Sequence, residues 1–210
     1  MLKPSMMPRN DDDDDDDDDE GCGTKSKSRQ SRRAERELLE RHRTIFISEE
    51  VSPALSGKII PQLLWLDTLS NEPIKLYINT PGGSADDGFA IHDAIRFIRS
   101  PVHCISVGLN ASAGTIILLG SPRDRRFALP NCRIMIHQPA GGVTGKASDI
   151  EITADQILQL RARANRLIAF ECGKPLAQVE ADTNNDYWLT PERALEYGLI
   201  GKILKTSKDI

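Results

Sequence analysis

Residues 74–98, IKLYINTPGGSADDGFAIHDAIRFI, change from one secondary-structure pattern to another around a pair of glycines. The first seven residues, IKLYINT, are rich in β-branched and aromatic side chains, which is typical of a strand. After PGGS, Ser84 can cap a helix, and Asp86 and Asp87 place negative charge in its first turn, where the helix dipole favours it. We therefore expect a strand that ends at the glycines and a helix that runs to about Ile98.

The alternation of strand and helix continues in both directions along the chain. It predicts further strands at 44–48, 102–107, 126–129, 133–137 and 199–204, and further helices at 34–42, 51–69, 149–170, 175–182 and 190–198, with another helix after Ser112. In the helix at 51–69, Gly57 and Pro61 should bend or split the rod. Strands that alternate with helices indicate an α/β fold with a largely parallel sheet covered by helices, and sites in such folds form beyond the carboxyl ends of strands.

The N-terminal region is dominated by charge. Residues 11–20 are ten consecutive acidic residues; without them the net charge changes from −4 to +6, and much of that positive charge follows directly in 24–43. Dense like charge with little to bury predicts that residues 1–33 are disordered, followed by one domain at 34–205 and a short tail at 206–210. The N-terminal tail has no aromatic residue that could stack on a base, so we expect no nucleic-acid partner.

Signals for targeting and for metal binding are missing from the sequence. The first ten residues lack the apolar stretch of a secretory signal, the acidic run argues against an organelle transit peptide, and no apolar run is long enough to span a membrane. The cysteines show no C-x-x-C pair, so neither a zinc site nor a disulfide framework is indicated, and a reducing cytoplasm is the expected location. The four cysteines are Cys22, Cys104, Cys132 and Cys172.

Ser112 lies between two alanines at the start of an apolar run, and two interpretations of it are open. It can cap a buried helix, or it can act as a nucleophile. A nucleophilic serine needs a base within hydrogen-bond reach and an acid that orients the base. His137 ends a strand at a glycine-rich loop, and Asp186 precedes an aromatic pair, although a structural histidine and a turn aspartate also fit. The other histidines are expected at the surface or an edge (His42, His92) or inside a strand (His103).

Backbone N–H groups for an oxyanion hole are available at two places. Glycines reach the required dihedral angles and leave room for a substrate, so PGGS at 81–84 can supply one amide. The amide that follows Ser112, at the start of a helix, can supply the other. Because the chain contains neither Gly-Lys-Ser nor G-x-G-x-x-G, nucleotide binding by this chain is not indicated.

Taken together and in this order, the motifs resemble those of the Clp protease proteolytic subunit, a family of caseinolytic serine endopeptidases. The matching stretches LYINTPGGSADDGFAIHDAIRFI, ASAGTIILLGSPRDRRFALPNCRIMIHQPAGGVTGKASDIEI and DTNNDYWLTPERALEYGLI cover most of residues 45–204. The resemblance implies a crotonase-like α/β fold of stacked, largely parallel strands with flanking helices. It also implies hydrolysis of peptide bonds through an acyl-enzyme. It places the nucleophile, base and acid at Ser112, His137 and Asp186, and the oxyanion amides at Gly83 and Ala113.

The resemblance also implies an assembly. Subunits of this family form seven-membered rings that stack around a chamber, and the long helix from about Asp149 would be the protruding handle that joins two rings. A partner AAA+ unfoldase ATPase uses the ATP and feeds unfolded proteins to the sites, so this chain needs no cofactor and no metal. The apolar pocket that receives the ATPase would include Tyr77, Phe97 and Phe127, with Lys75 where an aromatic residue is common.

Three departures from the family pattern bear on activity and assembly. Ala113 replaces a methionine, which keeps the amide but makes the wall of the substrate pocket smaller. Asn184 and Asn185 replace an acid and an arginine that pair across the rings, so stacking should be weaker or should depend on a paralogous subunit. The acidic tail replaces the axial loop, either as a removed propeptide or as a segment near the pore.

Two rival functions are compatible with parts of this pattern. A ring-forming subunit that does not cut would typically lack a triad member, whereas this chain has all three. A crotonase-type acyl-CoA enzyme would share the fold and an oxyanion hole but would not need a Ser-His-Asp set. A binding module that acts through the charged tail is a further alternative.

Overall fold

The computed structural model describes residues 29–210, with side chains from residue 33 onward. The helices of this part of the chain are α1 (Arg29–His42), α2 (Pro53–Leu69), α3 (Ala85–Phe97), α4 (Ala113–Leu118), α5 (Ala147–Cys172), α6 (Leu176–Asp182) and α7 (Pro191–Tyr197), with short 3-10 turns at Arg123–Arg125 and Ser207–Asp209. Its strands are β1 (Thr44–Ile47), β2 (Ile74–Thr80), β3 (Val102–Ala111), β4 (Arg126–Ala128), β5 (Arg133–Ile136), β6 (Tyr187–Leu189) and β7 (Lys202–Ile203).

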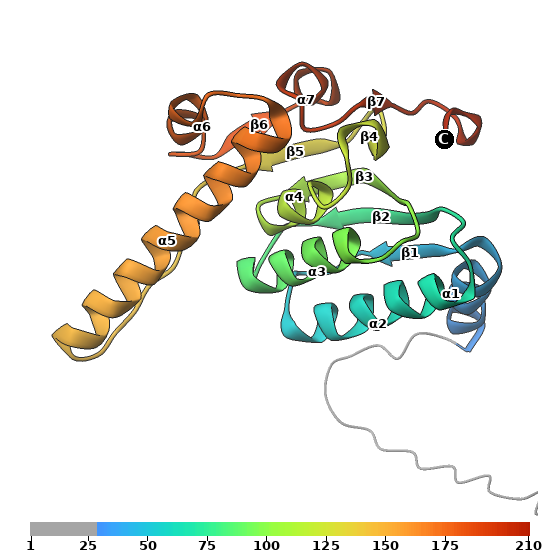
Figure 1. The fold of residues 1–210 in the computed structure, drawn as a ribbon, viewed down its shortest axis with the longest axis horizontal. Helices are drawn as coiled ribbons and strands as arrows, with labels where there is room; N and C mark the ends of the chain where they lie inside the picture. The colour runs from blue at the N-terminus through green and yellow to red at the C-terminus, as the bar shows by residue number, and fades with distance from the viewer. Residues whose placement is uncertain (1–28) are drawn as a thin grey trace, which may run out of the picture.

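One seven-stranded sheet organises the molecule (Figure 1). Its main path runs β1-β2-β3-β4-β7, and all of these neighbours are parallel. Strand β5 also pairs in parallel with β3, beyond the point where β4 leaves it, and β6 pairs antiparallel with β5. The predicted α/β fold with a largely parallel sheet is confirmed.

Helices α2, α3 and α4 cover one face of this sheet. Alternate residues of the strands point to that face, among them Ile45, Leu76 and Cys104, and they join a single large apolar cluster with the buried side chains of the three helices. The opposite face carries a separate small cluster of Ile105 and Phe127 with Leu204. The sheet therefore has one thickly covered face and one thinly covered face.

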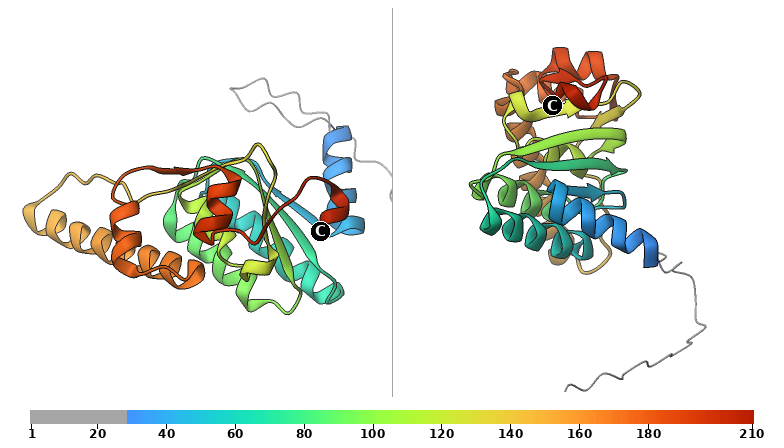
Figure 2. Two further views of the ribbon diagram at one scale, coloured as in Figure 1. Left: turned by 90° about the horizontal axis from the view of Figure 1, so that it is seen from above. Right: turned by 90° about the vertical axis from the view of Figure 1, so that its right-hand side faces the viewer.

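Helix α5 projects away from the body of the protein, whereas α1 and the C-terminus lie at the other end of the sheet (Figures 1 and 2). Its buried residues, Ala164, Asn165, Ile168 and Cys172, all lie in its C-terminal half. The helix ends at Gly173, whose φ of 64° is left-handed. This is the protruding helix that the resemblance implied from about Asp149.

Several sequence-based expectations need correction. Helix α2 is uninterrupted through Gly57 and Pro61, so neither residue splits it. Strand β3 does not stop at 107 but continues to Ala111, passing Gly108 at a φ of 59°. Strand β6 was not predicted. Helix α1 begins at Arg29, inside the range 1–33 that we expected to be disordered; residues 1–28 lie outside the described residues, and the remaining domain boundaries stay a prediction.

Candidate active site

Ser112 lies at the turn between β3 and α4, in a backbone conformation that few side-chain-bearing residues adopt. Its φ is 54° and its ψ is −119°, and its side chain makes no capping hydrogen bond to the helix. The Ser112 amide donates to the carbonyl of Met135 at 2.9 Å, and Thr115 donates to the Ser112 carbonyl through both its amide and its hydroxyl. Ser112 therefore occupies the N-cap position of α4, as the first interpretation expected, but its hydroxyl does not cap the helix.

The hydroxyl of Ser112 points at an imidazole. His137 Nε2 lies 2.8 Å from Ser112 Oγ, and His137 Nδ1 lies 2.9 Å from Asp186 Oδ1. A carboxylate can only accept, so Nδ1–H donates to Asp186 and Nε2 accepts from the serine hydroxyl. The structure thus brings together the three side chains that the sequence singled out as candidate nucleophile, base and acid.

The pairing of β5 with β6 explains why His137 and Asp186 meet. Ile136 of β5 is paired with Tyr187 of β6 in an antiparallel register. One further step along this register places His137 opposite Asp186. Because the unpredicted strand β6 creates this pairing, sequence periodicity alone could not have shown that the two residues are neighbours.

A short chain of hydrogen bonds fixes the two loops that carry the base and the acid. Gln138 donates from its amide to the Thr183 carbonyl at 2.7 Å and from its side chain to the Asn184 carbonyl at 2.8 Å. The buried hydroxyl of Thr183 donates to Asn165 of α5 at 2.9 Å. Sequence reasoning gave these residues no role, although Gln138 and Thr183 both lie within the stretches that carry the family resemblance.

The two amides proposed for the oxyanion lie beside Ser112. Gly83 (φ 136°) and Ala113, the first residue of α4, both line the same cavity as Ser112. Within the described residues neither amide donates a hydrogen bond, so both are available to a ligand. Gly82 (φ 100°) approaches so closely that a Cβ there would lie 2.7 Å from the Cβ of Ser112.

This cavity has a volume of about 390 Å³ and combines the polar groups with an apolar wall. Ser112, His137 and Gly83 are among the residues that line it. The apolar lining consists mainly of Ile116, Ile136, Leu160, Ala164 and Ile168. Such a cavity can hold an apolar side chain while a neighbouring carbonyl lies against the hydroxyl and the two amides.

Comparison with known proteins agrees with the geometry. The model of the Clp protease family matches residues 27–207. Proteolytic subunit 2 of the ATP-dependent Clp protease from Treponema denticola is 48% identical over 169 residues, which are 80% of this chain and 84% of the relative. The chain belongs to the Clp protease family. Subunit 3 from Rhizobium johnstonii is 44% identical over 82% of this chain and 89% of the relative. The solved structure of a ClpP1 mutant from Listeria monocytogenes has a TM-score of 0.77 and 39% identity, and the match covers 83% of this chain and 98% of that one.

This membership decides between the functions considered above. Proteolytic subunits of Clp proteases are serine peptidases, so this chain is a serine peptidase subunit with the Clp protease fold. Neither the crotonase-type acyl-CoA enzyme nor the non-cutting ring subunit is favoured. The smaller pocket wall expected from Ala113 stays a prediction. The Ala113 side chain is buried and packs closely against Gly88 of α3, where an added Cβ would lie 3.2 Å from the Cβ of Ala113.

The residues expected in the ATPase-docking pocket of this Clp subunit are only partly brought together. Tyr77 packs against the small cluster that contains Phe127, on the thinly covered face of the sheet. Phe97, the last residue of α3, is 81% exposed and is not part of this cluster. The docking role of the three residues remains a prediction.

In the described part of the Clp subunit, burial changes the chemistry of His92, Cys104 and Cys132. The expectation that His92 lies at the surface or an edge is wrong, because this residue of α3 is buried. Burial lowers the pKa of its imidazole despite a 2.8 Å contact with Asp93. Burial raises the pKa of the Cys104 thiol to about 12 and that of Cys132 to about 11, so neither is a ready nucleophile.

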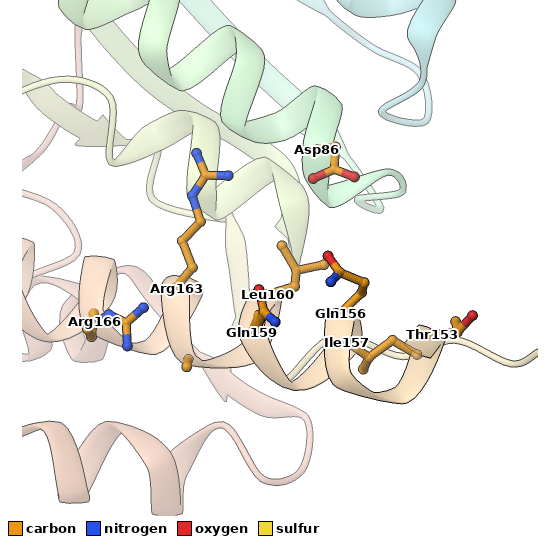
Figure 3. A pocket seen from close by; sticks show the side chains of 9 residues that line it. Asp86, Thr153, Gln156, Ile157, Gln159, Leu160, Arg163 and Arg166 are labelled. Atoms are coloured by element: carbon orange, nitrogen blue, oxygen red, sulfur yellow. The ribbon is translucent and has the colours of Figure 1, made fainter. Parts of the chain in front are cut away.

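Two other kinds of feature are missing from the described part of the chain. There, no group of three or more His, Cys, Asp or Glu side chains could hold a metal ion, and no helix is long and apolar enough to cross a membrane. A cavity of about 610 Å³ lies between α5 and the start of α3, with Asp86 opposite Arg163 and Gln156 (Figure 3). It shares Leu160 with the triad cavity but contains no triad residue.

Proposed function

We propose that Ser112, His137 and Asp186 hydrolyse peptide bonds through an acyl-enzyme. The Ser112 hydroxyl attacks the carbonyl carbon while His137 Nε2 takes its proton, and Asp186 stabilises the resulting imidazolium through Nδ1–H. The imidazolium then gives this proton to the leaving amine, which leaves an ester on Ser112. Water, deprotonated by the same imidazole, attacks the ester and releases the acid. The observation that carries this proposal is the unbroken series of contacts from Oγ to the carboxylate.

The amides of Gly83 and Ala113 are proposed to bind the oxyanion of each tetrahedral intermediate. Both lack a partner within the described residues, and both line the cavity beside Ser112. Amides that are already oriented stabilise developing negative charge without reorganising during the reaction. The apolar wall of the cavity favours substrates with an apolar side chain next to the cleaved bond.

We further propose that the substrates are unfolded proteins supplied by a Clp-family AAA+ ATPase, and that the subunits assemble into rings of seven. The relatives are named as subunits of ATP-dependent proteases, and the thinly covered sheet face offers for docking the half-buried Tyr77, which packs on the buried Phe127. Stacking of two rings, sharing of a ring with a paralogue, and action in the cytoplasm belong to the same proposal. The three described cysteines are free thiols, which suits a reducing compartment.

Labelling with a fluorophosphonate probe tests the catalytic proposal directly. The assembled protein should form a covalent adduct at Ser112, identified by mass spectrometry of the labelled peptide, and should hydrolyse a short fluorogenic peptide. Ser112→Ala should lose both signals while keeping the same sedimentation profile. An assembled wild-type oligomer that shows neither labelling nor hydrolysis would overturn the proposal.

A further inference from the structure

The thinly covered face of the sheet carries an apolar surface next to a group of positive charges. Tyr77 of β2 packs on the cluster of Ile105, Phe127 and Leu204, and its ring stacks on Phe46 of β1 at 5.3 Å between centroids. This cluster contains no residue of the described helices. The residues of the cluster itself are buried, whereas Phe46 is 41% exposed and Tyr77 is half-buried, so the stacked pair of Phe46 and Tyr77 is open to a partner.

Strand register places two of the positively charged or titratable side chains, Lys75 and His103, on this face. Lys75 precedes Tyr77 by two residues, so the two side chains point to the same face of the sheet. In the next strand His103 is paired with Lys75, and its ring lies edge-on to Phe127 at 5.7 Å. The sequence therefore places a lysine and a histidine directly beside the aromatic residues.

Arg125 adds a third group from the 3-10 turn that precedes β4. After burial, the charges of Arg125 and Lys75 are the main causes that lower the pKa of His103, whereas Asp124 opposes them. The imidazole of His103 thus lies near two cations, one carboxylate and the ring of Phe127. Positive charge therefore dominates around this imidazole.

These positive groups have no partner of their own. Within residues 33–210, neither the Lys75 ammonium nor the Arg125 guanidinium forms an ion pair or a side-chain hydrogen bond, and the buried Nδ1 of His103 has no hydrogen-bond partner. Arg43, which is also half-buried, is by contrast bonded to three backbone carbonyls. An unpaired group of positive charges beside an apolar surface is complementary to an anionic ligand with an apolar part.

We propose that this face binds a partner loop that lays a large apolar side chain on the stacked rings of Phe46 and Tyr77 and places a carboxylate among Lys75, His103 and Arg125. The inference rests on the proposed function, in which an unfoldase docks at Tyr77 and Phe127, and it adds the chemistry of the partner: an acidic residue beside the apolar anchor. On this proposal Lys75 favours partner loops that carry an acidic residue, and it does not weaken docking of every partner.

The same geometry makes binding of an acidic loop depend on pH. At neutral pH, Lys75 and Arg125 supply the positive charge, since the environment of His103 disfavours its protonated form. A bound carboxylate offsets the repulsion from these two cations and favours proton uptake by His103. Affinity for an acidic loop should therefore rise as the pH falls from 7.5 to 5.5, a range in which the loop carboxylates stay ionised.

A pair of synthetic peptides tests the proposal on the full-length chain. Both peptides share one central apolar segment with an aromatic residue; two aspartates flank it in one peptide and two lysines in the other. Binding is measured by fluorescence anisotropy on the Ser112→Ala protein, which cannot cleave them. We expect the aspartate peptide to bind at least fivefold more tightly, consistent with about 1 kcal/mol for one favourable surface ion pair, and the preference should shrink at high salt.

Two variants assign the preference to these residues. Lys75→Gln should reduce the preference by roughly fivefold, whereas Lys146→Gln, which removes one charge at the exposed start of α5, should leave it unchanged. His103→Gln should abolish the increase in affinity toward pH 5.5. Equal binding of both peptides, or equal effects of Lys75→Gln and Lys146→Gln, would overturn the proposal.

Further outcomes separate this inference from docking itself and from another occupant. If Tyr77→Ala abolishes binding of both peptides but Lys75→Gln changes nothing, docking at this face stands and the charge preference fails. If Tyr77→Ala leaves binding and ATPase-dependent degradation intact, docking at this face fails as well. If deletion of residues 11–20 raises peptide affinity, the acidic run of the same chain is the occupant, and the proposed partner loop is overturned.

Discussion

At the scale of single residues, the reactive hydroxyl depends on an unusual backbone. Ser112 is one of two residues other than glycine with a positive φ in the described part of the chain. The turn is held by the Met135 carbonyl, which accepts from its amide, and by Thr115, which donates twice to its carbonyl. Because the fold maintains this conformation before any substrate arrives, the hydroxyl is already aimed at His137.

Gly82→Ala should disable the enzyme without unfolding it. A methyl group at Gly82 would lie 2.7 Å from Ser112 Cβ and 2.9 Å from the Ala111 carbonyl oxygen, at a φ of 100° that disfavours alanine. Since misplacing a reacting group by about 1 Å can reduce the rate by about 100-fold, we expect a loss of this order in kcat/KM for a fluorogenic peptide.

Gly57→Ala is the matched control for this glycine substitution. A Cβ at Gly57 would have no atom within 4 Å, and the residue lies inside helix α2. Alanine should therefore leave hydrolysis unchanged and stabilise the helix by up to about 1 kcal/mol. Comparable losses of activity in the two variants would show that the close approach at Gly82 is not what positions Ser112.

At the scale of secondary-structure elements, Arg43 joins the end of α2 to the start of the sheet. Its guanidinium donates to the carbonyls of Leu66 at 2.9 Å, Ser70 at 3.1 Å and Glu72 at 3.1 Å. The first two are carbonyls at the end of the helix, where a positive charge is favoured. One side chain thus gives a second donor to the Leu66 carbonyl, which also accepts from the Ser70 amide, and a donor to the Ser70 carbonyl beyond the end of the helix.

Arg43→Ala should lower the free energy of unfolding by about 2 kcal/mol, because hydrogen bonds to charged groups are worth about 1.5–3 kcal/mol. Arg43→Lys should recover only part of this, since an ammonium cannot reproduce the planar fork that reaches three carbonyls. Denaturant unfolding followed by circular dichroism, at one fixed protein concentration, measures both. If the lysine variant were as stable as the wild type, a single charge at the helix end would account for the effect.

The sequence predicted elements well where local chemistry determines them. Ser84 caps α3 by accepting from the Asp87 amide, and α7 lies between its Thr190 cap and Gly198, as expected. Continuity of α2 was not predicted, because packing of Ile59, Leu63 and Leu66 in the core outweighs the hydrogen bond lost at Pro61.

Elements that depend on distant pairing were beyond reach of the sequence. Strand β6 spans only Tyr187–Leu189 and is defined by its pairing with β5, and the last part of β3 is likewise defined by β5. Ser112, His137 and Asp186 were singled out through the resemblance of their motifs to those of the Clp protease family, since each residue alone also fitted a structural role. The contact between these three residues and the burial of His92 both result from tertiary packing, which the periodicity of the sequence does not reveal.

At the scale of the whole molecule, burial of His92 makes stability depend on pH. Its pKa is lowered in the folded protein, chiefly by burial, so the unfolded chain binds the proton more readily. The stability that comes from burying a neutral His92 is therefore fully present above the ordinary imidazole pKa of about 6.5. It is lost as the pH falls below that value, because the unfolded chain then takes up a proton. The melting temperature of His92→Gln should therefore decline less between pH 7.5 and 5.5 than that of the wild type.

His42→Gln is the control for this prediction. His42 is the exposed last residue of α1, so its replacement should leave the slope of melting temperature against pH unchanged. Comparing slopes rather than absolute values removes any constant effect of the substitution on packing. Equal slopes for wild type and His92→Gln would assign the acid sensitivity to other groups.

Assembly should depend on Asn184 and Asn185. Both are exposed beside the loop that carries Asp186, and neutral amides cannot form the charge-assisted contact that an acid and an arginine would form between rings. We expect the chain alone to sediment as a single ring or smaller, and the double variant Asn184→Glu, Asn185→Arg to shift it toward double rings. A stable double ring of the unmodified chain in analytical ultracentrifugation would contradict this.

The anchoring of α5 by only its C-terminal half has a consequence for how assembly can be observed. The half that begins at Ala147 buries no side chain in the protomer, and it exposes Ile152 and Leu158. A helix without tertiary support is only marginally stable in water. The amides of its outer turns should therefore exchange with deuterium in the free subunit and become protected when neighbouring subunits cover them. Deuterium uptake in this segment would then measure the fraction of chains that are assembled, without any attached label.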